Sequence, residues 1–194
     1  MTCIVGIANG KNVWMGGDRC GSSETEKFEI VYPKIWIGDI PTGGFFNNST
    51  EKIIVGDRGS FRCAPLMRYG LKLPKLKTNQ KAIEWLAIDF ADALREIFKK
   101  KGFTEIKDNS EIMPEDSAFL IGLRGHIYCM EPNFQILDIK VNEYAIGSGG
   151  PFALGSLHTS KNLGWTPQKR IESGLQAAAD INPYVAPPFD IMNI

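Results

Sequence analysis

Thr2-Cys3-Ile4-Val5-Gly6-Ile7, directly after Met1, is the stretch around which the rest of the chain is organised. A hydroxyl residue here precedes an apolar, partly β-branched run that is typical of a first strand. The initiator is generally removed before a small residue such as Thr, and Thr2 would then carry a free α-amine beside its hydroxyl. The amine can accept the hydroxyl proton, so the pair supplies a nucleophile and its base. An ordinary first strand is the alternative interpretation.

The residues that follow predict a β-hairpin. Asn9-Gly10 is a strong signal for a two-residue turn, and residues 13–17 then resume a strand pattern. In such a hairpin the end of the second strand lies beside the start of the first, so we expect Asp18 close to Thr2. A carboxylate at this position can orient a base or pair with a cation, whereas the simpler alternative is a turn residue at a strand end.

A lysine and a glycine stand out in the next predicted strands. Lys34 begins a predicted strand over residues 34–40 and lies between apolar neighbours, so its ammonium, if buried, needs a partner or a chemical task. A surface lysine on an edge strand is the alternative. Residues 52–56 predict another strand, and Gly59 follows it closely. A glycine in this place lets the backbone approach a ligand and can present its N–H group to an oxyanion.

Composition restricts the class of protein. The chain has 194 residues, which suits one α/β or α+β domain, and its 22 basic and 22 acidic residues predict no nucleic-acid-binding surface. There is no apolar run long enough to span a membrane and no signal peptide, so we expect a cytoplasmic protein with no membrane partner. Four scattered cysteines without CxxC spacing predict buried, reduced thiols and no metal site.

The middle and the end of the chain predict the scaffold. Apolar residues at helical spacing predict a helix from Thr78 or Asn79 to about Lys101, stopped by Gly102. Thr166-Pro167 predicts the cap and first turn of a last helix. Further strands are expected at residues 117–123, 126–130, 135–139 and 144–146, and a helix is expected from Pro151 towards His158.

These features, in this order, resemble the proteasome β-subunit and its bacterial HslV relatives, which are N-terminal-nucleophile (Ntn) hydrolases. The most specific match is Ala145-Ile146-Gly147-Ser148-Gly149-Gly150-Pro151-Phe152-Ala153, which is similar to an HslV-type segment. The final helix, with Asp180 near its end, is similar to the closing helix of the family. The resemblance extends from Thr2 to Asp180 and so covers almost the whole chain.

The resemblance implies an α+β fold, a four-layer αββα sandwich of two antiparallel sheets flanked by helices, in one domain over residues 1–194. It implies a threonine-type endopeptidase that works without a cofactor inside a homo-oligomeric ring, on peptides or unfolded proteins, with an AAA+ unfoldase as a possible partner. It also implies roles for individual residues: Thr2 as nucleophile, Lys34 as cation, Asp18 as its carboxylate, the Gly59 amide as oxyanion donor, and Ser148 and Asp180 as outer polar groups near the amine.

The same resemblance places Asp57, Arg58 and Gly21 in substrate binding. Asp57-Arg58 replaces the small or apolar residues usual before the oxyanion glycine, and we expect Asp57 to favour basic side chains before the cleaved bond. The loop at residues 41–51 is longer than the usual hairpin of the family, so it is a candidate to reshape the groove, touch a neighbouring subunit or cover the site. An Ntn amidase acting on small amides and an inactive structural subunit are the alternative functions.

Overall fold

The first two strands form the predicted hairpin in a computed structural model that describes residues 2–23, 25–43 and 49–194. Strands β1 (Ile4–Ala8) and β2 (Val13–Asp18) pair antiparallel, with Ile4 opposite Gly17. Four residues connect them, so the prediction of a two-residue turn is wrong. The reason is local: the Asn9 side chain accepts the N–H groups of residues 11 and 12 and so shapes a wider turn.

This hairpin is the centre of a four-stranded antiparallel sheet. Its strand order is β12-β1-β2-β13, with β12 at Glu143–Ile146 and β13 at Phe189–Asn193. The pattern of the sequence indicates β12, but we did not predict β13. The last strand is half-buried along its length and pairs with β2, so the two ends of the chain are joined in one sheet.

A second antiparallel sheet has five strands in the order β11-β10-β9-β6-β5. Strands β5 and β6 form a hairpin whose register runs from Ile35 opposite Gly56 to Pro41 opposite Thr50. The strands span Ile35–Pro41 (β5), Thr50–Arg58 (β6), Ala118–Leu123 (β9), His126–Met130 (β10) and Ile136–Asp138 (β11).

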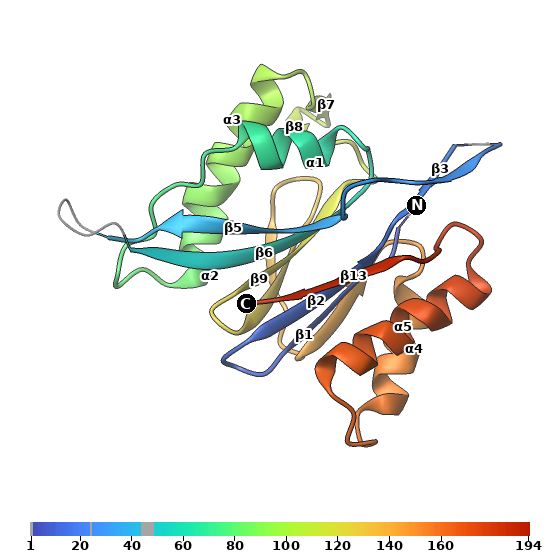
Figure 1. The fold of residues 1–194 in the computed structure, drawn as a ribbon. Coiled ribbons are helices and arrows are strands. Elements are labelled where there is room, and N and C mark those ends of the chain that lie inside the picture. Colours follow the sequence, from blue (N-terminus) through green and yellow to red (C-terminus); the bar gives the residue numbers. More distant parts are fainter. Residues whose placement is uncertain (1, 24, 44–48) are drawn as a thin grey trace.

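The long loop at residues 41–51 is shorter than predicted, because both strands continue into it and pair at Pro41 and Thr50. Residues 44–48 of this loop lie outside the described residues. Its described ends lie about 20 Å along the hairpin from the Lys34 end, since six strand residues rise roughly 3.3 Å each. Figure 1 shows the Pro41 end of β5 and the Thr50 end of β6 on the side of the molecule opposite the N-terminus.

Two helices cover one face of the four-stranded sheet. Helices α4 (Gly150–Ser160) and α5 (Pro167–Ile181) bury an apolar cluster against β1 and β2 that includes Val5, Leu157, Ile171 and Leu175. The predicted cap of α5 is correct, because the Thr166 hydroxyl accepts the N–H of Lys169 at 3.3 Å. Burial of this apolar stripe holds the pair of helices on the sheet.

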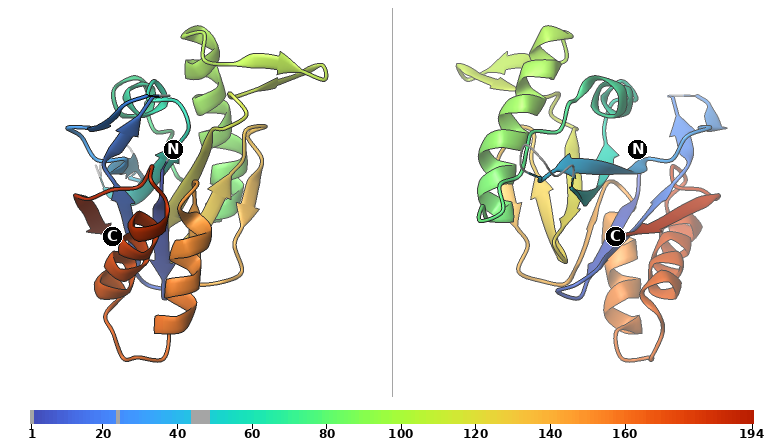
Figure 2. Two further views of the ribbon diagram at one scale, coloured as in Figure 1. Left: turned by 90° about the vertical axis from the view of Figure 1, so that its right-hand side faces the viewer. Right: turned by 60° about the vertical axis from the view of Figure 1, so that its left-hand side comes forward.

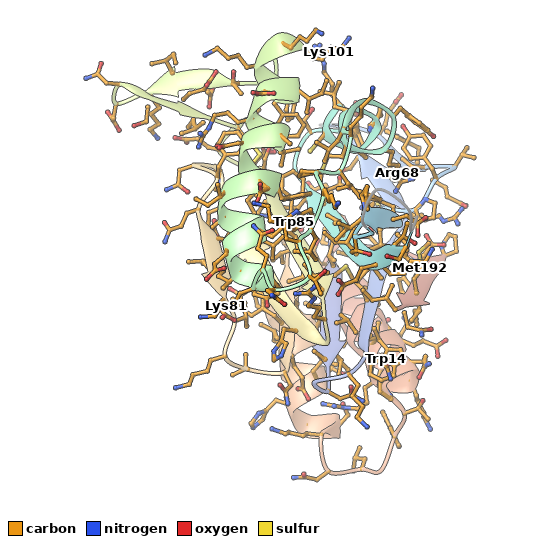
Figure 3. The ribbon with its side chains drawn as sticks, turned by 90° about the vertical axis from the view of Figure 1, so that its left-hand side faces the viewer. Trp14, Arg68, Lys81, Trp85, Lys101 and Met192 are labelled. Carbon is orange, nitrogen blue, oxygen red and sulfur yellow. The ribbon has the colours of Figure 1, made fainter. Side chains whose placement is uncertain are left out.

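A longer helical stretch covers the five-stranded sheet. It consists of α2 (Ala82–Trp85), the π-helical segment η2 (Leu86–Phe90) and α3 (Ala91–Lys100), and Figure 3 labels Lys81 and Lys101 at its two ends. The helix therefore begins later than its predicted cap at Thr78 or Asn79. Its N-cap is Lys81, whose N–H is accepted by the Glu84 side chain. Its own side chains Trp85, Phe90 and Phe98 are fully buried.

The two sheets face each other between these helices, as Figures 1 and 2 show. A third apolar cluster, which includes Ile4, Met15, Ile54 and Leu120, contains residues from both sheets. None of the helices in the described part of the chain is long and apolar enough to cross a membrane. The remaining elements are β3 (Cys20–Ser22), β4 (Lys27–Glu29), α1 (Cys63–Pro65), the π-helical segment η1 (Leu66–Gly70), β7 (Glu105–Lys107) and β8 (Ser110–Ile112).

Candidate active site

The end of β2 lies beside the start of β1, as the hairpin register requires. Thr2 and Asp18 are both buried there, at 5% and 0% exposure. Asp18 Oδ1 accepts the N–H of Cys3 at 2.8 Å, and the Asp18 N–H donates to the Cys3 carbonyl at 3.3 Å. The backbone directly after Thr2 is thus tied to the carboxylate that the sequence places near it.

Lys34 completes a buried ion pair with this carboxylate. It lies just before β5, and its ammonium donates to Asp18 Oδ2 at 2.9 Å and to the Cys20 carbonyl at 2.7 Å. Asp18 Oδ2 also accepts the Cys20 N–H at 2.9 Å. Both charges are almost fully buried, so desolvation is compensated by pairing and by backbone hydrogen bonds. The alternative of a surface lysine is therefore wrong.

One pocket, partly open to solvent, brings together Thr2, Lys34, Asp57 and Gly59. Apolar walls are supplied by Ile30, Tyr32, Phe61 and Ala64. The site therefore has a hydroxyl, an ammonium, a buried carboxylate and a glycine backbone in contact with the same space.

Gly59 has a backbone that suits glycine alone. Its φ is +109°, and a Cβ there would lie 2.9 Å from Ser117 Cα and 3.1 Å from the Asp116 carbonyl oxygen. The backbone of the loop after β6 thus passes closely over residues 116–117. This conformation, which sequence spacing could not reveal, sets the direction of the loop at the pocket.

We expect Gly59→Ala to lower the free energy of unfolding by roughly 2–3 kcal/mol, because the new Cβ meets backbone atoms in a conformation that alanine rarely adopts. Urea denaturation measures the change. Gly155→Ala is the matched control: Gly155 lies in α4 with nothing near its added Cβ, so this variant should gain stability slightly. Equal stability of Gly59→Ala and the wild type would contradict the expectation.

The glycine-rich turn before α4 packs on the backbone of Thr2. The Gly149 N–H donates to the Thr2 carbonyl at 3.2 Å, and a Cβ on Gly147, whose φ is +93°, would lie 2.1 Å from that carbonyl oxygen. The turn thus needs glycine to approach Thr2 this closely. Ser148 lies within the turn, but it is exposed and does not line the pocket.

Asp180 lies near the end of α5 and is exposed. Its carboxylate accepts a hydrogen bond from Gln176 of the same helix at 2.6 Å. It is not among the described residues that line the pocket, so its place near the Thr2 amine stays a prediction.

Arg58 and Gly21 also lie outside the pocket lining. Arg58 follows Asp57 on β6. Burial raises the pKa of Cys129 and of Tyr144, and the Arg58 charge opposes this rise in part, which places Arg58 near β10 and β12. Gly21 packs against Phe28, since an added Cβ would meet that ring at 2.3 Å. The Phe28 ring contacts Phe61 at a centroid distance of 6.0 Å, so Gly21 supports a pocket wall indirectly.

The thiol of Cys3 is adjacent to Thr2 in the sequence and is a poor nucleophile. Cys3 is fully buried, and burial, with a smaller effect of Asp18, raises its pKa to about 12. Since the thiolate is the reactive form of cysteine, the Cys3 side chain stays neutral and inert near neutral pH. All four cysteines are free and buried, as predicted.

Sequence analysis missed an ion pair that fixes the segment beside the pocket. Arg19, just after β2, makes two hydrogen bonds of 2.7 Å to Asp190 of β13 and a third of 2.8 Å to the Val31 carbonyl. The Arg19 carbonyl also accepts the N–H of Ile30, which lines the pocket. The adjacent Asp18-Arg19 in the sequence was a signal that Arg19 contributes to the site. Its partner Asp190 lies on β13, which we did not predict.

Comparison with solved structures identifies the fold. BPH from Thiobacillus denitrificans, solved in complex with epoxomicin, matches with a TM-score of 0.76 at 17% identity, over 100% of this chain and 98% of that one. HslV from Trypanosoma brucei matches with a TM-score of 0.62 at 17% identity, over 99% and 98%. Anbu (ancestral beta-subunit) from Yersinia bercovieri matches with a TM-score of 0.64 at 10% identity, over 100% and 81%.

No protein-family model and no curated protein matches the sequence. The structural similarity therefore rests on the arrangement of the elements over the length of the chain, and it extends well beyond a shared motif. The chain has the fold shared by BPH, HslV and Anbu, which is the fold of the proteasome-like N-terminal-nucleophile proteins.

Proposed function

We propose that this chain is an N-terminal threonine endopeptidase, and that residues 1–194 form a single Ntn-hydrolase domain arranged as a four-layer αββα sandwich. The observation that carries the proposal is the buried ion pair of Lys34 and Asp18 in contact with a pocket that Thr2 and Gly59 also line. A buried pair can be purely structural, but its ammonium here lies against the same space as a hydroxyl nucleophile.

The reaction begins with removal of Met1, which lies outside the described residues. The freed α-amine of Thr2 titrates near pH ~8, so a useful fraction is free base at neutral pH. The amine accepts the hydroxyl proton as Thr2 Oγ attacks the peptide carbonyl. The bond between Oγ and the carbonyl carbon forms, and the carbonyl electrons move to its oxygen.

The negative oxygen then accepts a hydrogen bond from the Gly59 N–H. As the carbonyl re-forms, the C–N bond breaks, and the α-ammonium of Thr2 passes its proton to the departing amine. An ester on Thr2 remains. Water attacks this ester with the amine again as base, which releases the acid and regenerates the hydroxyl. No metal ion or organic cofactor takes part in these steps.

Lys34 supplies the positive charge of the proposed mechanism. Its ammonium is held by Asp18 and by the Cys20 carbonyl, so it is oriented before substrate binds. A fixed cation beside Thr2 favours loss of the hydroxyl proton, because it stabilises the alkoxide that develops. Ser148 and Asp180 remain the proposed outer polar groups near the amine, and the support for Ser148 is that the neighbouring Gly149 N–H donates to the Thr2 carbonyl.

We also propose that the chain works in the cytoplasm as a homo-oligomeric ring that admits peptides or unfolded proteins, with an AAA+ unfoldase as a partner. The support is the fold shared with HslV and with a protein described as an ancestral beta-subunit. An amidase acting on small amides would use the same residues, so assembly separates the two functions. Light scattering should give the mass of a ring for the peptidase and of a monomer or dimer for the amidase.

Intact mass before and after treatment with epoxomicin tests the nucleophile and the base together. We chose this probe because BPH has been solved in complex with it. Its epoxyketone requires a hydroxyl and an adjacent free amine, so we expect loss of Met1 and one adduct per chain. The Thr2→Ala variant should form no adduct. Retention of Met1 without an adduct would contradict the proposal and favour an inactive scaffold.

A further inference from the structure

Asp57 is a buried carboxylate in the candidate active site that the proposed chemical steps do not use. It lies near the end of β6, opposite Phe119 of β9, and its N–H donates to the Lys34 carbonyl at 3.2 Å. The residue is 7% exposed and lines the pocket with Thr2 and Gly59. Its side chain is therefore removed from bulk water but borders the space that a substrate would enter.

The carboxylate lacks a counter-ion within the described part of the chain. Asp57 Oδ1 is fully buried and has no hydrogen-bond partner there. Arg68 of η1 (labelled in Figure 3) is close enough to oppose the charge of Asp57, but no ion pair joins the two residues. Its Nη2 donates to the Pro33 and Ile35 carbonyls and its guanidinium lies over the Tyr32 ring, while its Nε is buried and has no hydrogen-bond partner among the described residues. Lys34 forms its ion pair with Asp18.

A buried carboxylate without a partner is unfavourable when charged. Burial raises the pKa of Asp57 to about 7, and the charges of Arg68 and Lys34 oppose that rise only in part. From α1, Cys63 also faces this carboxylate, and its own pKa is raised mainly by burial, with smaller effects of Asp57 and Asp116. The ionised form is therefore only partly stabilised by the two cations and the Asp57 backbone, and its Oδ1 has no hydrogen-bond partner among the described residues.

A lysine or arginine side chain fits the composition of this pocket. The apolar walls from Ile30, Tyr32 and Phe61 suit its aliphatic part, and Asp57 offers an acceptor to its charged tip. The residue whose carbonyl is attacked must lie next to Thr2, so its side chain is the one that can enter a pocket shared with Thr2. A leucine would fill the walls but leave the carboxylate unpaired.

We propose that Asp57 makes the enzyme select substrates with arginine or lysine immediately before the cleaved bond. This inference rests on the proposed peptidase function and deepens it, because it assigns the substrate class to a buried pocket carboxylate whose Oδ1 has no hydrogen-bond partner among the described residues. Selection depends on ionised Asp57, so the preference is full at pH 8 and declines as the pH falls towards 5.5.

The decisive comparison uses fluorogenic peptides that differ only in the residue before the reporter: arginine, its neutral isostere citrulline, leucine or aspartate. We expect the wild type at pH 8 to show a kcat/KM for arginine about 10- to 100-fold above that for citrulline. In Asp57→Asn the two values should differ less than about threefold. Asp39→Asn is the matched control, since Asp39 is 56% exposed and pairs with Lys52 away from the pocket.

A binding measurement keeps the test independent of turnover. Butylguanidinium carries the tip of an arginine side chain, and calorimetry should detect its binding to the wild type at pH 8. The signal should be lost at pH 5.5 and in Asp57→Asn, but kept in Asp39→Asn.

The possible failures are distinguishable. No cleavage of any peptide and no epoxomicin adduct would refute the peptidase function, while butylguanidinium would still report on the Asp57 site. Cleavage with equal rates for arginine and citrulline, or a preference that survives Asp57→Asn, would overturn the Asp57 inference and leave the peptidase function standing. Absence of butylguanidinium binding at pH 8 would also overturn it.

Discussion

Lys34→Ala is expected to reduce peptide turnover by on the order of 10³-fold or more. The variant removes the cation whose ammonium lies 2.9 Å from Asp18 and lines the pocket with Thr2. Without that charge, the alkoxide that develops on Thr2 loses its electrostatic stabilisation, so transfer of the hydroxyl proton to the amine becomes less favourable. Initial rates with a fluorogenic peptide at pH 8 measure the loss.

The same substitution leaves Asp18 buried without its ammonium. Loss of one partner of a buried pair typically costs about 3–5 kcal/mol of stability. Asp18 retains the N–H donors of Cys3 and Cys20, so the chain is expected to stay folded at low temperature, and circular dichroism should verify this before rates are compared. Lys52→Ala, on an exposed lysine, is the control and should keep full activity. A folded Lys34→Ala protein with normal turnover would remove lysine from the mechanism.

Asp57→Asn is expected to stabilise the protein, and more so at high pH. Burial moves the pKa of Asp57 from 3.8 to about 7, so the folded state favours the protonated carboxyl. The stability this provides is complete below pH 3.8 and is lost as the pH rises through about 7. A shift of roughly three units corresponds to about 4 kcal/mol, so the asparagine variant should gain about 4 kcal/mol at pH 8 and about 2 kcal/mol at pH 5.

Urea denaturation at the two pH values, at one fixed protein concentration, measures this difference. Asp39→Asn should show no comparable dependence on pH, since its carboxylate is exposed. An Asp57→Asn protein less stable than the wild type at pH 8 would mean that the charge has a partner in solution. A gain in stability would also show that the Asp57 charge does not serve folding. A carboxylate that destabilises the fold but lines the pocket is better explained by a role in substrate binding.

Local signals account for the parts of the fold and site that could be predicted. Alternation of β-branched residues and the turn at residue 9 predicted the first hairpin, and strand pairing then placed Asp18 beside Thr2. The Thr166 cap and the buried apolar stripe of α3 could be predicted for the same reason, because each depends on residues a few positions apart. Even there, the helical stretch begins at Ala82, later than the predicted cap at Thr78 or Asn79.

Other features depend on residues far apart in the chain. Arg19 pairs with Asp190, 171 positions away, and the strand that carries Asp190 has no strong pattern because it is only half-buried. The sequence also could not predict that Ser148 and Asp180 are exposed, because a family motif indicates a position along the chain but not the direction of a side chain.

By itself, the sequence predicted the first hairpin, the long helical stretch and the last helix, and it indicated Thr2, Asp18, Lys34 and Gly59 as candidate groups. Short-range patterns and backbone preferences carry that information, because they act between residues close in the chain. Only the tertiary structure decided that the Lys34 and Asp18 charges are buried together, while Asp57 Oδ1 has no hydrogen-bond partner among the described residues. The physical reason is that these groups are brought together by segments far apart in the chain, and such contacts have no signature in the order of the residues.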